Sequence, residues 1–234
     1  RSSNIGAVKI VDQLGNHNDN AAFNTMFDYM ERMGISTVVR PENPYLAPNG
    51  HKFSDSTYST ALGGMTHGVS PLELTAAFST LANQGVYANP ITFTEIRDKH
   101  GNIILENKPE KKRVVSPEVA YVVTDLLKSA VTSGTGSRAR LDSGNSQIPV
   151  AGKTGTTNDQ KDAWFVGYTP YYVAATWIGY DTPDRLPQGS TMAAKIWSKI
   201  MKRVHEDYSP KNFESADNIL RTNICSESGK LPTE

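Results

Sequence analysis

Three apolar segments joined by short polar turns, between residues 149 and 179, constrain the fold more than any other feature of the sequence. We expect strands near 149–156, 163–168 and 171–179. Turns this short favour antiparallel pairing, because a parallel pair needs a crossover connection of about a dozen residues or more. The pattern of these three segments therefore predicts an antiparallel sheet in the late part of the chain.

Two helices are predicted in the first half of the chain. The first runs to Gly34 from a cap at Asp19 or Asn20, and the second opens with a capping box formed by Ser70 and Glu73. Their expected inner faces consist of Phe23, Met26, Phe27, Met30 and Met33 in the first helix, and of Leu74, Phe78 and Leu81 in the second. Amphipathic helices of this kind cover a core.

Two further helices are predicted on either side of the sheet segments. One starts at Ser116 and ends at Gly134, and the other runs from about Thr191 to Glu206. Their expected inner faces are Val119, Val122, Val123, Leu126, Leu127 and Ala130 in the former, and Met192, Ile196, Trp197, Ile200, Met201 and Val204 in the latter. The basic residues of the last helix are interpreted as a solvated face.

The remaining segments are connections. Residues 41–60 have no period and predict a long exposed excursion, whereas residues 86–106 alternate around a turn at His100 and Gly101 and predict a hairpin. Beyond Tyr208 the chain is a polar tail. The predicted fold class is α+β, with an antiparallel sheet flanked by helices.

Bulk properties exclude several classes of function. Lys plus Arg equals Asp plus Glu at 24 each, so no overall charge attracts nucleic acid. No run reaches the roughly 20 apolar residues that span a bilayer. Cys225 is the only cysteine and the five histidines lack metal-site spacing, so we expect no internal disulfide, no metal and no cofactor.

The stretch AGKTGTT, residues 151–157, allows two interpretations. A phosphate-binding loop needs a glycine where this chain has Gln147, and it needs a helix afterwards, whereas a strand is expected here. The alternative is one wall of an acyl-transfer cleft, in which Lys153, Thr154 and Thr156 bind a carboxylate while Gly155 lets a ligand approach the backbone. By itself the tripeptide Lys153-Thr154-Gly155 is also compatible with an ordinary solvated edge strand.

The start of the chain provides a second element. Ser2, Ser3 and Asn4 form a short polar turn before an apolar segment that is expected to be helical. Such a turn can present a hydroxyl and an amide to a cleft, although a helix cap is its commoner use. Ser-x-Asn followed by Lys-Thr-Gly belongs to the signature of penicillin-binding proteins and serine β-lactamases.

The chain resembles the C-terminal part of the transpeptidase domain of a class A (bifunctional) penicillin-binding protein. The resemblance also rests on the segments GVSPLELTAAFSTLANQGVYANP, SGTGSRA, AGKTGTTNDQKDAWFVGYTP and ATWIGYD. It implies a penicillin-binding protein/serine β-lactamase-like fold over residues 1–208, followed by the polar tail at 209–234. The family's Ser-x-x-Lys element is absent, since none of the serines has a lysine three positions later. We therefore expect its nucleophile on an upstream fragment of the same protein.

The resemblance implies acyl transfer through a serine ester on a peptidoglycan stem peptide ending in D-Ala-D-Ala, with β-lactams as mimics. Ser2 would relay a proton, Asn4 would hold a substrate amide carbonyl, and Lys153 would supply positive potential. Thr154 and Thr156 would bind the carboxylate, and the Thr156 N–H would form half of an oxyanion hole. The location implied is the outer face of the bacterial membrane, with an anchor, and a glycosyltransferase domain, outside this chain.

Two other functions remain open at this stage. A D,D-carboxypeptidase or a β-lactamase would use the same fold with water as the acceptor, and a non-catalytic module would only bind stem peptides.

Among the aromatic residues, Trp164, Phe165, Tyr168 and Trp177 are expected to pack the sheet core. Asp162 is expected to anchor a turn.

Overall fold

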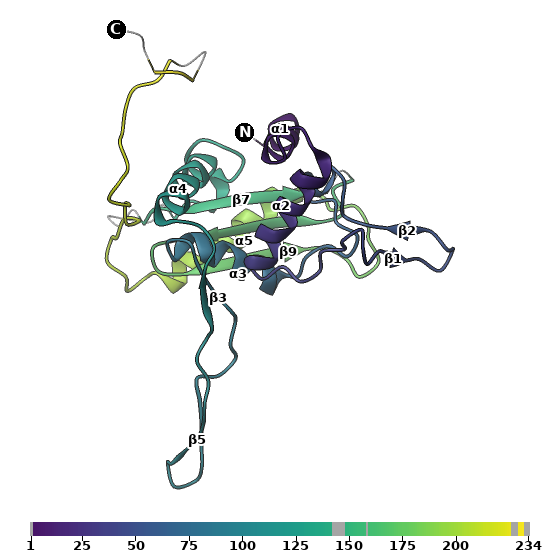
Figure 1. Cartoon of the computed structure of the whole chain (residues 1–234). Helices are drawn as coiled ribbons and strands as arrows, with labels where there is room; N and C mark the ends of the chain where they lie inside the picture. Colours follow the sequence, from purple (N-terminus) through teal and green to yellow (C-terminus); the bar gives the residue numbers. More distant parts are fainter. Residues whose placement is uncertain (1, 142–147, 158, 226–228, 232–234) are drawn as a thin grey trace.

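A three-stranded antiparallel sheet lies at the centre of the computed structural model (Figure 1), which describes residues 2–141, 148–157, 159–225 and 229–231. Its strands, in spatial order, are β7 (Ala151–Thr156), β8 (Ala163–Tyr168) and β9 (Val173–Ile178). The expected sheet is confirmed, and both strand pairs are antiparallel. The loop position Gln147, with the rest of 142–147, lies outside the described residues.

Helices cover both faces of this sheet. Phe165 on β8 packs edge-on against Trp197 of α5 (Gly189–Val204), with ring centroids 5.1 Å apart. Tyr168, three positions along the same strand, faces the other way, because side chains alternate along a strand. Its hydroxyl lies 2.8 Å from Thr124 Oγ1 of α4 (Pro117–Thr132). The sheet therefore separates α5 on one face from α3 (Pro71–Ala82) and α4 on the other.

The first two helices build a smaller core of their own. They are α1 (Asn4–Leu14) and α2 (Asp19–Arg32), and their buried contact consists of Val11, Ala22, Phe23 and Phe27. The cap of α2 is Asn18, whose side chain accepts a hydrogen bond from the Ala21 N–H, so the prediction of Asp19 or Asn20 as the cap is wrong by one or two residues.

The buried faces of the other helices differ from those expected. In α3 the most buried residues are Ala76, Ala77 and Thr80, and the predicted Leu74, Phe78 and Leu81 are only half-buried. In α4 they are Ala120, Thr124 and Val131, while the predicted Val119, Val122 and Leu126 are exposed. In α5 Trp197 and Met201 are buried as predicted, but Met192, Ile200 and Val204 are exposed. In α3 and α4 the buried positions are mostly small residues, which allow a helix backbone to approach its neighbours closely.

The segment predicted to be an exposed excursion contains a buried anchor. It forms the short strands β1 (Tyr45–Leu46) and β2 (Lys52–Phe53) and the 3-10 helix η1 (Thr60–Leu62). Most of its side chains are exposed, but Asp55 is buried. The Asp55 carboxylate accepts hydrogen bonds from the Val39 N–H and from the N–H and hydroxyl of Thr66, so it fixes the segment on the body.

The predicted hairpin is present and extends further than expected. β4 (Glu95–Arg97) pairs with β5 (Ile103–Glu106) around the turn at His100 and Gly101. Closer to the body, β3 (Val86–Ala88) pairs with β6 (Lys111–Arg113), which lies beyond the predicted range. Together they form a narrow ribbon that projects away from the sheet (Figure 1).

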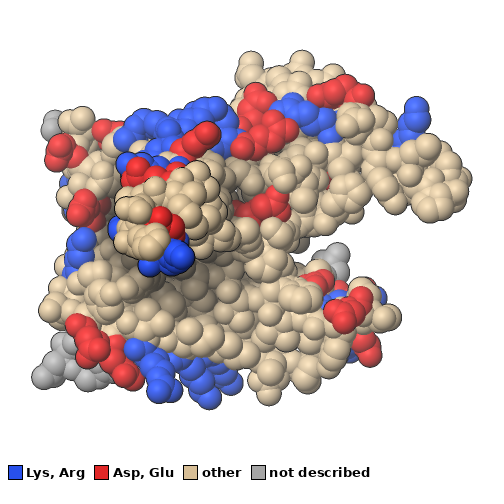
Figure 2. Space-filling view, turned by 90° about the horizontal axis from the view of Figure 1, so that it is seen from below, with Lys and Arg blue, Asp and Glu red and all other residues tan. Residues whose placement is uncertain are grey.

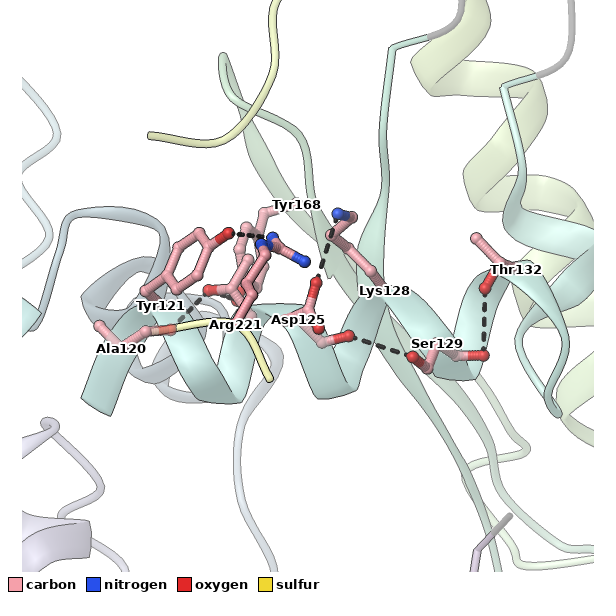
Figure 3. Close-up of polar contacts among 9 residues, drawn as sticks. Ala120, Tyr121, Asp125, Lys128, Ser129, Thr132, Tyr168 and Arg221 are labelled. Carbon is pink, nitrogen blue, oxygen red and sulfur yellow. Dashed lines mark hydrogen bonds and ion pairs between the residues drawn. The ribbon is translucent and has the colours of Figure 1, made fainter. Parts of the chain in front are cut away.

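The C-terminal segment runs along the body without forming a helix or strand up to Cys225. Phe213 packs edge-on against Tyr168 at 5.5 Å between centroids, and Glu214 accepts a hydrogen bond from Gln84 at 2.7 Å. Arg221 reaches the Tyr121 hydroxyl at 2.7 Å, across α4 (Figure 3). The segment between Ser209 and Arg221 thereby touches α4, β8 and the turn that follows α3. No described helix is long and apolar enough to cross a membrane.

Candidate active site

Lys153 lies in the middle of β7, opposite Val166 of β8. β7 is paired on one side only, and two of its glycines let it approach β8 closely. A Cβ at Gly152 would lie 2.6 Å from Phe165 Cζ, and a Cβ at Gly155 would lie 3.1 Å from Trp164 Cβ. The glycines that the sequence places around Lys153 and Thr154 therefore hold an edge strand tightly against the sheet.

The structure brings Lys153 together with the start of the chain. The Ser3 hydroxyl accepts a hydrogen bond from the Gly6 N–H and caps α1, which leaves Ser2 just ahead of the helix. Lys153 Nζ donates to Ser2 Oγ at 3.2 Å, across 151 positions of sequence. The two sequence motifs therefore meet in space, and helix capping accounts for Ser3 but not for Ser2.

Lys153 is half-buried and has no carboxylate partner among the residues that the structure describes. Burial lowers its pKa below the ordinary value of 10.5, because the charged ammonium loses hydration. Its other hydrogen bond goes to the Thr154 carbonyl oxygen at 3.2 Å. A lysine with this environment offers positive potential to an incoming anion and exchanges a proton more readily than an exposed lysine.

The other predicted site residues do not take part in the contact between Lys153 and Ser2. Thr154 is half-buried, and its hydroxyl lies 2.8 Å from the hydroxyl of Thr135. Gly155 follows it, and Thr156 is exposed at the end of β7. Asn4 is the first residue of α1 and is exposed, and its side chain makes no hydrogen bond within the described part of the chain.

Sequence reasoning missed Thr135 as a site residue. It lies in the turn that follows α4, inside the segment SGTGSRA, and it meets Thr154 on β7. The only signal in the sequence is a threonine between two glycines, which indicates a tight turn but no chemistry. Its position beside the candidate site depends on how α4 packs on β7.

The residues expected to be structural are mostly so. Phe165 and Tyr168 are fully buried, whereas Trp177 is 42% exposed, so the core assignment is wrong for Trp177. Asp162 accepts a hydrogen bond from the Trp177 indole at 2.9 Å and its own N–H donates to Thr157 Oγ1, which ties the β7–β8 turn. Within the described residues there is no group of three or more His, Cys, Asp or Glu that could hold a metal ion.

An anion would be attracted by the Lys153 ammonium at the candidate site rather than by the net charge of the whole chain, which is zero. On the face drawn in Figure 2, basic and acidic side chains lie beside one another near the edges, and a broad area between them is uncharged. At the candidate site the Lys153 ammonium contacts the Ser2 hydroxyl, and on the neighbouring residue of β7 the Thr154 hydroxyl contacts that of Thr135. This set can bind a carboxylate through charge and hydrogen bonds, and can pass a proton between Lys153 and Ser2.

Comparison with known proteins gives a family match for most of the chain. Residues 1–202 match the family described as penicillin binding protein transpeptidase domain. A curated relative, penicillin-binding protein 1A of Clostridium botulinum, is 36% identical over 236 aligned residues, which cover 100% of this chain and 26% of that protein. The chain thus spans about a quarter of the length of such relatives.

Solved structures share the fold. Penicillin-Binding Protein 1A from Haemophilus influenzae superposes with a TM-score of 0.78 at 21% identity, covering 100% of this chain and 37% of that one. The PonA1 protein from Mycobacterium tuberculosis in complex with penicillin V gives 0.70 at 22% identity, covering 88% of this chain and 55% of that one.

Proposed function

The chain belongs to the penicillin-binding protein transpeptidase domain family, and on that premise we propose that it supplies the carboxylate-binding side of a serine D,D-transpeptidase site. The observation that carries the proposal is the contact between Lys153 Nζ and Ser2 Oγ at 3.2 Å. A lysine whose pKa is lowered, placed beside a serine hydroxyl, attracts a carboxylate electrostatically and provides a route for proton transfer.

The reaction proposed is transfer of an acyl group between amines. A serine oxygen attacks the penultimate D-Ala carbonyl of a stem peptide, the peptide bond breaks, and D-Ala leaves with a proton on its nitrogen. An amine of a neighbouring stem then attacks the ester, which forms the cross-link and returns the serine. Ser2 relays the proton toward the leaving nitrogen. Lys153, which donates a hydrogen bond to Ser2 Oγ, orients that hydroxyl group.

The other side chains hold the substrate. Thr154 and Thr156 hydrogen-bond the terminal carboxylate, and Asn4 binds the amide carbonyl of the stem peptide. The Thr156 N–H forms half of the oxyanion hole, and one such donor is worth about 3 kcal/mol of transition-state stabilisation. Gly155 lets the substrate backbone lie against β7.

We place the attacking serine on another segment of the same protein. No serine in the 234 residues has a lysine three positions later. The curated relatives are roughly four times as long as the aligned part, which leaves ample length for such a segment. The domain would therefore comprise residues 1–208 together with that segment, followed by the tail at 209–234.

The proposed partners are stem peptides ending in D-Ala-D-Ala and the β-lactams that mimic them. Penicillin V binding by a structural neighbour supports the second. Because the substrate lies in the cell wall, the proposed location is the outer face of the bacterial membrane. An anchor and a glycosyltransferase domain would lie outside this chain.

The test uses labelled penicillin, the full-length protein and intact-mass spectrometry. We expect one adduct, which peptide mapping places outside residues 1–234, and no adduct on the 234-residue chain alone. Lys153→Ala in the full-length protein should slow acylation by about 100-fold, whereas Lys199→Ala, on the exposed side of α5, should not. An adduct on a serine of this chain, or none on the full-length protein, would contradict the proposal.

A second measurement separates transpeptidation from related reactions. With a stem-peptide donor and an amine acceptor, the full-length protein should form the cross-linked product. Release of D-Ala without cross-linking would identify a carboxypeptidase, and rapid turnover of penicillin would identify a β-lactamase.

A further inference from the structure

The turn after α4 lies directly beside the strand that carries Lys153. Thr135, in the turn Ser133–Gly136, places its hydroxyl 2.8 Å from the Thr154 hydroxyl. α4 and β7 also pack against each other. Thr135 therefore reaches the candidate site from a different element and from outside the Ser-x-Asn and Lys-Thr-Gly motifs.

Packing fixes the backbone on both sides of Thr135. The Gly136 N–H donates to the Ala130 carbonyl at 2.9 Å. A Cβ at Gly134 would lie 2.7 Å from that same carbonyl oxygen, and a Cβ at Gly136 would lie 3.2 Å from Phe165 Cε2. Both flanking positions therefore favour glycine, and the turn is held between the last turn of α4 and the sheet core.

We propose that Thr135 is a positioning residue that orients the Thr154 hydroxyl toward a ligand carboxylate, an inference that rests on the proposed function. Each hydroxyl has one proton and can also accept. When Thr135 donates to Thr154 Oγ1, the Thr154 proton points away from Thr135 and can be donated to the ligand.

The ligand itself selects this arrangement. An ionised carboxylate only accepts hydrogen bonds, so it can bind Thr154 only when the Thr154 proton is directed at it. Thr135 then completes a chain of two hydrogen bonds that ends on a charged group, and such bonds are stronger than neutral ones. Lys153, which bonds the Thr154 carbonyl, adds positive potential at the same place.

The experiment measures the second-order acylation rate constant of the full-length protein with benzylpenicillin and with its methyl ester, which lacks the charged carboxylate. Thr135→Val keeps the shape but removes the hydroxyl, and we expect about a 10-fold loss with benzylpenicillin. With the ester the loss should be less than about 2-fold, because there is no carboxylate to orient toward. Thr135→Ser should restore the wild-type rate.

The matched control is Thr132→Val. Thr132 is exposed on the last turn of α4, and its hydroxyl bonds only the Ser129 carbonyl of its own helix among the described residues (Figure 3). This variant should leave both rate constants unchanged, and thermal unfolding should show that both valine variants fold.

A double-mutant cycle then tests whether Thr135 acts through Thr154. In a Thr154→Val background the additional Thr135→Val change should have no further effect, whereas additive losses would show independent action and overturn the inference. Equal losses with penicillin and ester, or no loss at all, would also overturn it. Failure of the wild-type protein to be acylated would instead refute the proposed function.

Discussion

At the scale of single residues, Lys153 shows a cost of building the site. Its ammonium is half-buried and has no described carboxylate partner. Burial lowers its pKa, so the unfolded chain binds more protons than the folded chain between that lowered pKa and about 10.5. The free energy of unfolding therefore rises with pH in that window, and at neutral pH the charge opposes folding.

This gives a prediction for Lys153→Met in the full-length protein. Methionine keeps the length of the side chain but removes the charge, so we expect the domain to gain about 0.5–2 kcal/mol at pH 7 while penicillin acylation is lost. Chemical denaturation followed by acylation kinetics measures both. Lys195→Met, at an exposed position of α5, is the control and should change neither. A Lys153→Met protein that is less stable than wild type would contradict this account.

The sequence predicted part of this site and could not predict the rest. Ser2 and Lys153 could be paired because the order of their motifs resembled a known family, and the structure brings them together. Thr135 could not be paired with Thr154, because their contact follows from the packing of α4 on β7 rather than from any local pattern. The catalytic and binding roles of Ser2, Asn4, Lys153, Thr154 and Thr156 stay predictions.

At the scale of elements, capping residues predicted where helices begin more reliably than apolar residues predicted which face is buried. Ser70 and Ser116 cap α3 and α4 as expected. In α4, however, Ala120 and Thr124 are buried, Thr124 against Tyr168 of β8, while the larger Leu126 is exposed. Helical periodicity identifies the helix, but close approach to a sheet selects small residues, which hydrophobicity alone does not reveal.

The capping box of α3 makes an acid-sensitive contact. Burial alone would raise the pKa of Glu73, but hydrogen bonds from the N–H and hydroxyl groups of Ser36 and Ser70 outweigh it and lower the pKa to about 2, from an ordinary 4.5. A lowered pKa means that the stabilisation is complete above about pH 4.5 and is lost as the pH falls toward 2. Glu73 thus joins the start of α3 to the segment after α2.

We expect Glu73→Gln to cost roughly 1–2 kcal/mol of unfolding free energy at pH 6, after allowing for solvent screening. The difference from wild type should shrink as the pH is lowered to about 3 and below, because the unfolded wild-type chain then binds a proton on Glu73 that the folded chain binds only near its lowered pKa. Urea unfolding at the two pH values measures it. Glu110→Gln, at an exposed position, should be neutral at both, and a Glu73→Gln difference that does not depend on pH would contradict the assignment.

At the scale of the whole molecule, the C-terminal segment connects parts that are distant in sequence. Phe213 packs on the buried Tyr168 of β8, Glu214 bonds Gln84 just beyond α3, and Arg221 bonds Tyr121 of α4. The sequence predicts only a polar tail here, and the structure has no helix or strand in residues 209–225. The sequence could not predict these contacts, because a single aromatic residue in a polar stretch forms no periodic pattern.

The contribution of this segment can be measured with a matched pair of substitutions. Phe213→Ala should lower the unfolding free energy by about 1–2 kcal/mol, through loss of the ring contact and of buried area. For a domain of this size that is a shift of roughly 2–8 °C in Tm. Leu220→Ala, at a position that is 94% exposed, should have no effect. Equal Tm values for the Phe213→Ala and Leu220→Ala proteins would show that the segment does not stabilise the body.

The projecting ribbon has a consequence for how such chains can vary in length. Its outer hairpin is closed by pairing between β4 and β5 alone, and a Cβ at Gly101 in its tip would meet nothing within 4 Å. Insertions or deletions there would lengthen or shorten the ribbon without moving β7, β8 or β9. This tip is therefore a place where residues can be gained or lost without disturbing the sheet, and where an epitope could be inserted into the protein.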